Sequence, residues 1–291
     1  MLTRKPVVAG YFYESGFERL DRQIFECFIS KRGPGDSPVK RGNAKVTHGV
    51  VSPHAGYQFS GPAAAWAHKD IAESKFPSRF IIIGPNHTGM ANARVSTTLA
   101  SWETPLGTVE ADREFIREII KSCDLVKDDY SALSQEHSIE VQIPFLQFAN
   151  KDRMRDLRIV PLVVSYYDLE SCKTLADTIA GISEEFCVIA SSDFTHYGPN
   201  YGYTPFFRNK KENMYSLDGK AIDFIKSMDT KGFLEYVDRK RATICGAGAI
   251  ALCMELMKNL GVKKSELLNY YTSGDVVNDY ENMVGYAAIK F

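Results

Sequence analysis

The sequence lacks the features that mark a membrane-spanning or secreted protein. No stretch approaches the ~20 consecutive apolar residues of a transmembrane helix, and the N-terminal stretch MLTRKPVVAGYFYES has no apolar signal core. The 6 cysteines are scattered with no CxxC pair, so in a chain of 291 residues we expect most of them to be reduced thiols in the core. We therefore expect a soluble, cytoplasmic protein that does not bind membranes.

A strong excess of charge is also absent. The formal net charge is -1, and no block of like charges stands out. The chain therefore has no long-range attraction toward polyanions, and nucleic acid is a poor candidate partner. Neither GxGxxG nor GxxxxGK[ST] occurs, so no standard phosphate-binding loop is predicted, and HExxH is missing as well.

The residues that are present favour one large α/β domain spanning residues 1–291. With 44% hydrophobic and 24% charged residues, the chain can bury a large core. A strand is predicted at 46–51, a helix beginning with Ser60 as its cap and Pro62 in its first turn, and a second strand at 80–83. This strand-helix-strand order implies parallel pairing.

Apolar spacing predicts further helices and strands along the chain. Further helices are predicted at 17–29, 112–123, 134–149 with a kink or restart at Pro144, 171–182, 216–227, 232–238 and 244–260. Further strands are predicted at 157–164, 186–190, 266–272 and 283–291, and TPLG at 104–107 marks a turn.

Three apolar runs lead into polar loops that carry histidine. The first precedes His54, the second runs into GPNH with His87, and the third precedes Asp193 and His196. In an open α/β sheet, ligands bind outside the carboxyl ends of the strands. We therefore expect three imidazoles to face one crevice.

Other candidates lie outside the strand ends. The segment 134–149 reads as a helix with His137 and Glu140 three apart on one face, and we count His137 as a catalytic candidate. Cys245 lies in TICGAGAI, where Thr243 would cap the next helix and place the thiol in its first turn. The helix dipole lowers the pKa of a thiol there, although a buried core cysteine is the alternative.

This set of side chains suits a metal. Two or three imidazoles with one anionic ligand favour iron, copper or zinc, and a thiolate favours the later metals. Asp193, next to His196 in DFTH, offers either a partner for a ligand or an acid/base pair.

Six motifs, in this order and spacing, resemble those of the Memo family. They are PHAGY at 53–57, GPNH at 84–87, TPLG at 104–107, EHSIE at 136–140, SSDFTHYG at 191–198 and TICG at 243–246. The likeness extends from AGYFY near the start to GYAA at 285–288, so it covers nearly the whole chain. Each motif alone is unspecific, but together they are highly specific.

The resemblance implies a three-layer α/β/α fold with a mostly parallel central sheet, similar to the LigB-like class III extradiol dioxygenases. Those enzymes hold ferrous iron with two histidines and a carboxylate and use a further histidine as acid/base. Carried onto this chain, His54 and His87 match the two histidine ligands and Cys245 the third Memo ligand. His196, with Asp193 close by, matches the acid/base histidine. Cysteine in place of the carboxylate departs from the dioxygenases and shifts the preference among metals.

The resemblance also implies a divided family. Animal members are associated with motility signalling, peptide binding and redox behaviour linked to copper or iron. Microbial members resemble one component of a three-part set, the AmmeMemoRadiSam system, with a radical SAM enzyme and an AMMECR-type protein as partners.

Three functions follow as alternatives. The first is a redox protein that binds iron(II) or copper, with zinc less favoured, at His54, His87 and Cys245, and moves protons with His196 and Asp193. The second is a module that binds a peptide or small molecule in the same crevice without turnover. The third is a cysteine hydrolase with Cys245 as nucleophile and His196 as base.

Overall fold

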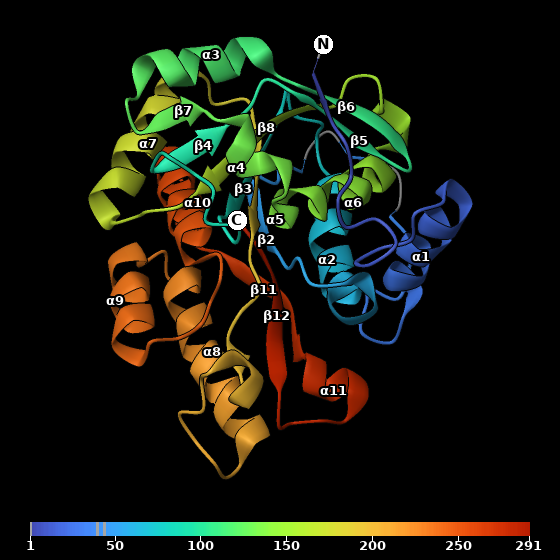
Figure 1. The fold of residues 1–291 in the computed structure, drawn as a ribbon, viewed down its shortest axis with the longest axis vertical. Helices are drawn as coiled ribbons and strands as arrows, with labels where there is room; N and C mark the ends of the chain where they lie inside the picture. Colours follow the sequence, from blue (N-terminus) through green and yellow to red (C-terminus); the bar gives the residue numbers. More distant parts are fainter. Residues whose placement is uncertain (1, 39–40, 43–44) are drawn as a thin grey trace.

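A mixed β-sheet runs through the middle of the molecule. In the computed structural model, which describes residues 2–38, 41–42 and 45–291, twelve strands join into this sheet (Figure 1). The central strands, in spatial order, are β6 (Gly107–Ala111), β8 (Arg158–Val164), β3 (Phe80–Pro85), β9 (Cys187–Ser191) and β2 (Gly49–Ser52). Neighbours in this central group are all parallel, as the strand-helix-strand order predicts.

The outer strands are mostly antiparallel. On one side, β12 (Met283–Lys290) pairs with β2, β10 (His196–Tyr197) and β11 (Glu266–Thr272). The other side has β1 (Thr3–Arg4), β4 (Val95–Thr97), β5 (Ser101–Thr104) and β7 (Val126–Asp128). The predicted turn at TPLG is confirmed, because it connects the antiparallel strands β5 and β6.

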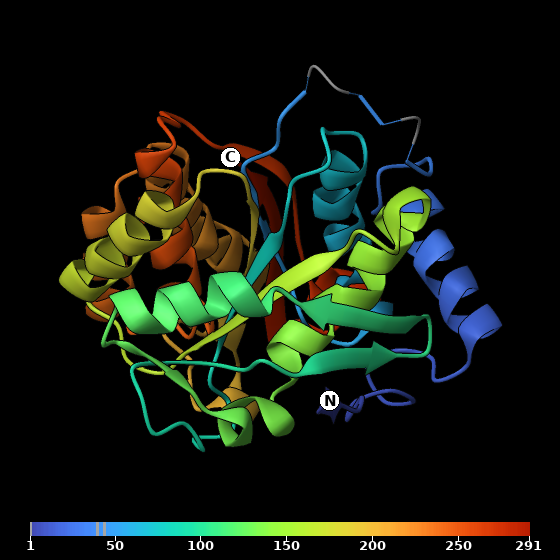
Figure 2. The ribbon, with the colours of Figure 1, turned by 90° about the horizontal axis from the view of Figure 1, so that it is seen from above.

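Helices cover both faces of the sheet (Figure 2). One face carries α3 (Arg113–Ser122), α7 (Leu169–Ile182), α8 (Lys210–Lys226), α9 (Thr230–Lys240) and α10 (Ala247–Asn259). The other carries α1 (Phe17–Ile29), α2 (Tyr57–Ala72) and α6 (Gln142–Ala149). The predicted three-layer α/β/α fold is therefore confirmed. Within the described part of the chain, no helix is both long and apolar enough to cross a membrane.

The central strands are apolar along their length because both of their faces are covered. All residues of β3 are buried, which explains why its sequence is a continuous apolar run rather than an alternating one. Short elements complete the chain: α11 (Ser273–Val277) and two 3₁₀ turns at Lys151–Arg153 and Pro199–Tyr201.

The predicted single helix at 134–149 is wrong, because three helices occupy this region. α4 (Tyr130–Ser134) ends before Glu136, whose extended backbone and side chain cap α5 (His137–Glu140). α6 follows, with Pro144 in its first turn, where a missing N–H leaves no hydrogen bond unmade. The break before α5 therefore comes from the cap at Glu136, whereas the helix restarts at Gln142 with Pro144 in its first turn, as predicted.

The predicted start of α2 is also wrong. The helix begins at Tyr57, and Pro62 lies inside it rather than in its first turn. The Ser60 hydroxyl does not cap the helix and instead donates to the Ala55 carbonyl at 2.8 Å.

Candidate metal centre

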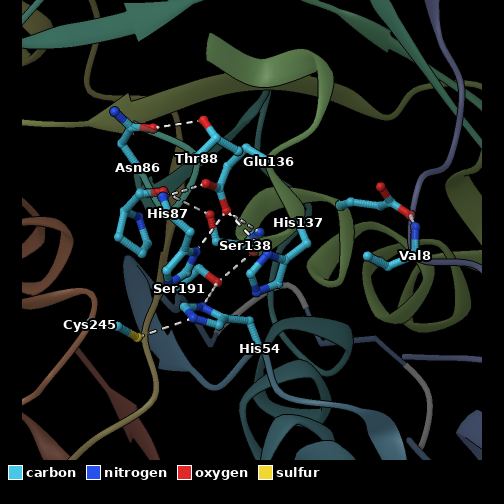
Figure 3. A network of polar contacts seen from close by, with 12 residues as sticks. Val8, His54, Asn86, His87, Thr88, Glu136, His137, Ser138, Ser191 and Cys245 are labelled. Carbon is cyan, nitrogen blue, oxygen red and sulfur yellow. Dashed lines mark hydrogen bonds and ion pairs between the residues drawn. The ribbon is translucent and has the colours of Figure 1, made fainter. Parts of the chain in front are cut away.

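Three histidines from separate parts of the chain meet at the carboxyl ends of the central strands. His54 follows β2, His87 follows β3, and His137 is the first residue of α5 (Figure 3). One ring nitrogen from each lies within 4.8 Å of the others. The ring centroids of His87 and His137 are 4.6 Å apart, and those of His54 and His87 are 5.1 Å apart. We call these three residues the histidine cluster.

Glu136 orients His87. Its buried carboxylate accepts hydrogen bonds from His87 Nδ1 at 2.9 Å, from His87 N at 2.6 Å and from Ser138 N at 2.9 Å. Burial alone would raise the pKa of Glu136, but these bonds outweigh it and bring the pKa to about 2. Because the ionised carboxylate can only accept, His87 Nδ1 carries the hydrogen, which leaves Nε2 as the nitrogen that could bind a metal.

His54 is held through both its backbone and its ring. The His54 N–H donates to Asp193 Oδ1 at 2.8 Å, and ring atom Nδ1 lies 2.9 Å from Ser191 Oγ. On the other side of the ring, Nε2 lies 3.1 Å from Cys245 Sγ. His54 therefore directs Nε2 toward the region between Cys245 and the other histidines (Figure 3).

The electrostatics favour neutral imidazoles at His54 and His137. Burial, reinforced by repulsion from neighbouring histidines, lowers the pKa of His54 well below its usual range. The same two causes lower the pKa of His137 to about 4. Neutral imidazole is the form that binds metal, so this donor set fits iron, copper or zinc.

The N-terminal segment holds α5, and with it His137, in place. The Arg4 guanidinium is fully buried, forms an ion pair with Glu140 and donates to the Glu136 carbonyl at 2.8 Å. Glu140 also accepts from Tyr13 Oη at 2.6 Å. His137 and Glu140 therefore have different roles: His137 belongs to the histidine cluster, whereas Glu140 anchors the N-terminal segment.

Cys245 lies beside the cluster but not where the sequence predicts. α10 begins at Ala247, so the cysteine precedes the helix, and the Thr243 hydroxyl bonds His196 N and O instead of capping it. Burial raises the pKa of Cys245 well above its usual range, so the predicted lowering is wrong. Among the described residues, the group of donors within 4.8 Å consists of histidines, and Cys245 as a metal ligand stays a prediction.

Asp193 and His196 line the same cavity as the cluster, and its volume is about 460 Å³. His196 Nδ1 donates to the Thr243 carbonyl at 3.1 Å, so Nε2 is the nitrogen without this anchor. Burial raises the pKa of Asp193, although His196 acts in the opposite direction. Four aromatic side chains form other parts of the wall: Phe12, Phe59, Tyr201 and Tyr286.

Comparison with known proteins identifies the family. A family profile described as "Memo-like protein" matches residues 4–290. The chain belongs to the Memo family. A MEMO1 family protein of Methanopyrus kandleri is 42% identical over 294 residues, covering 100% of this chain and 99% of the relative. Another, from Nitrosopumilus maritimus, is 41% identical over 292 residues, covering 100% of both chains. A third, from Methanococcus maripaludis, is 38% identical over 293 residues, covering 99% of each.

In this Memo family chain, sequence reasoning missed two residues that orient the cluster. Glu136 lies directly before His137 and caps α5, but glutamate is not among the residues preferred at the start of a helix, so no local signal in the sequence indicates this cap. Ser191 is the last residue of β9, and nothing near it in the sequence indicates that its hydroxyl reaches His54, which is 137 residues away.

Proposed function

We propose that this Memo family chain is a redox protein that binds iron or copper at His54 and His87. The observation that carries the proposal is the approach of three histidine nitrogens to within 4.8 Å of one another. The third donor is either His137, which belongs to that group, or Cys245, whose sulfur lies 3.1 Å from His54 Nε2. An imidazole donor suits iron(II) and copper, whereas a thiolate favours copper(I).

A metal held by three protein donors would supply open coordination positions for oxygen or a substrate, together with one-electron chemistry. The surrounding residues would manage protons. His196 bonds the Thr243 carbonyl through Nδ1, so its Nε2 is free to accept a proton from a ligand in the cavity. Asp193, buried beside it, would stabilise the imidazolium that forms.

A second candidate function is binding of a small molecule or peptide without turnover. The aromatic wall of the cavity supports it, because such walls bury much of a ligand's surface. We also propose an AMMECR-type protein and a radical SAM enzyme as partners, because the family resemblance implies them. The two functions differ in one respect, since a simple binding module should take up its ligand equally well with and without metal.

The proposal is tested by loading the protein with Fe(II) or Cu(I) without oxygen and measuring bound metal after desalting. We expect close to one metal per chain in the wild type and loss of binding in His54→Ala and His87→Ala. His48→Ala, a histidine outside the cavity lining, is the matched control and should bind as the wild type does. Comparing His137→Ala with Cys245→Ser for each metal identifies the third donor. A wild type that takes up neither metal overturns the proposal.

A further inference from the structure

The single hydroxyl hydrogen of Ser191 is committed to a backbone carbonyl. Ser191 is fully buried, and Oγ lies 2.6 Å from the Ser138 carbonyl oxygen. A carbonyl can only accept, so the hydroxyl must donate to it. Toward every other partner, Ser191 Oγ can therefore act only as an acceptor.

Gln142 takes one of the remaining acceptor positions. Its Nε2 lies 2.9 Å from the Pro53 carbonyl and 2.9 Å from Ser191 Oγ. Turning the amide over would point its oxygen at the Pro53 carbonyl, so this orientation is fixed. Gln142 Oε1 then accepts from His68 Nε2 at 3.2 Å, which extends the chain of bonds to a second buried histidine.

The last acceptor position of Ser191 faces His54. Nδ1 of His54 lies 2.9 Å from Ser191 Oγ, and since the hydroxyl hydrogen is used elsewhere, Nδ1 must supply the hydrogen. We infer that Ser191 is a positioning residue that holds His54 as its Nδ1–H tautomer, with the lone pair on Nε2, the ring nitrogen 3.1 Å from Cys245 Sγ (Figure 3).

The opposite tautomer is incompatible with this network. With the hydrogen on Nε2, the lone pair of Nδ1 would face the lone pair of Ser191 Oγ. Relieving that repulsion would require Ser191 to turn away from Ser138 and leave a buried carbonyl without its donor. Neutral histidine in water favours the Nε2–H form, so the protein must hold His54 in the less common tautomer. The role of this tautomer in binding a metal rests on the proposed function, but the assignment of the tautomer does not.

Ser52 offers a matched control for Ser191. The two residues are neighbours on adjacent parallel strands, and both are fully buried serines. The Ser52 hydroxyl, however, has no hydrogen-bond partner among the described residues. Ser52→Ala therefore removes the same atom from the same layer of the sheet without touching the network.

The test is a ¹⁵N spectrum of metal-free protein labelled in histidine, together with titration by Fe(II) and Cu(I). We expect His54 of the wild type to show a protonated Nδ1 and an unprotonated Nε2. Ser191→Ala should give a mixture of tautomers and lower the metal affinity about 10- to 100-fold, whereas Ser52→Ala should change neither.

A wild-type spectrum with the hydrogen on Nε2 overturns the inference, and this measurement needs no variant to fold. The inference is also overturned if Ser191→Ala shows the same ¹⁵N shifts for His54 and the same metal affinity as the wild type. If the wild type has the expected tautomer but binds neither metal, the proposed function fails while the assignment of the tautomer stands.

Discussion

The Glu136 carboxylate joins His87 and α5 through a 2.9 Å bond to His87 Nδ1 and a 2.9 Å bond to Ser138 N. Glu136→Gln would replace an acceptor oxygen with an amide group that donates. We expect the affinity for Fe(II) or Cu(I) to fall about 10- to 100-fold, as is typical when the partner of a metal-binding histidine is lost. Titration of the metal-free variant measures the change.

The control for Glu136 is Glu185→Gln, an exposed acid that accepts from Ser78 Oγ outside the cavity. It should bind metal as the wild type does. Equal affinities for both variants would mean that Glu136 has no part in orienting His87.

Gly84 provides the room for α5 to approach β3. A Cβ at this position would lie 2.3 Å from Ser138 Oγ and 3.2 Å from Ile139 Cγ1. We expect Gly84→Ala to lower the free energy of unfolding by about 1–3 kcal/mol, as overpacking does, and to weaken metal binding by displacing His137. Urea unfolding measures the first effect.

Gly181→Ala is the matched control for Gly84, because a Cβ there meets nothing within 4 Å. Gly181 lies in α7, where alanine should be neutral or add up to about 1 kcal/mol. An unfolding free energy for Gly84→Ala equal to that of Gly181→Ala would contradict the close packing of α5 on β3.

The position of His87 can be predicted from the local sequence, whereas that of His137 cannot. The apolar run of β3, which the structure extends through Gly84 and Pro85, leads into polar residues and so predicts the position of His87 from a local pattern. The entry of His137 into the cluster depends on Arg4, which contacts the N-cap of α5 although it lies 132 residues away in the sequence. No local periodicity reports such a contact.

The local sequence also fails to predict how Cys245 and His196 are oriented. Cys245 was predicted inside a helix because TICGAGAI leads into an apolar helical run, but the helix begins two residues later at Ala247. His196 was expected with His54 and His87, and it reaches their cavity, yet its Nδ1 is bound to the Thr243 carbonyl. Side-chain direction at a strand end is set by tertiary contacts, which the sequence pattern does not contain.

The buried Arg4 and Glu140 pair should be essential for stability. Arg4→Met would leave Glu140 buried without its cation, and such a loss costs about 3–5 kcal/mol. Lys5→Met, next to it in the sequence, removes an exposed pair with Glu103 and should cost no more than about 1 kcal/mol. Urea unfolding compares the two, and similar small losses would contradict a structural role for the buried pair.

Asp218 should make stability depend on pH. Burial raises the pKa of this carboxyl to about 6, although hydrogen bonds from Thr195 and Tyr270 act in the opposite direction. A raised pKa means that the fold favours the protonated form. The contribution is complete below the ordinary pKa of 3.8 and is lost as the pH rises through about 6.

Asp218→Asn should remove this loss, which is on the order of 3 kcal/mol for a shift of about two pH units. Urea unfolding at pH 4 and pH 7.5 measures it, with Asp223→Asn, an exposed residue of the same helix, as the control. If Asp218→Asn and the wild type lose stability in parallel between these pH values, the carboxyl is not the source.

The most direct test of a metal centre is anomalous scattering from crystals of protein purified and loaded without oxygen, with data collected on both sides of the iron and copper edges. We expect one peak of iron or copper in contact with His54 Nε2 and His87 Nε2, and with His137 or Cys245 as the third donor. No peak at this position after loading, or a peak that contacts neither His54 nor His87, would contradict the account.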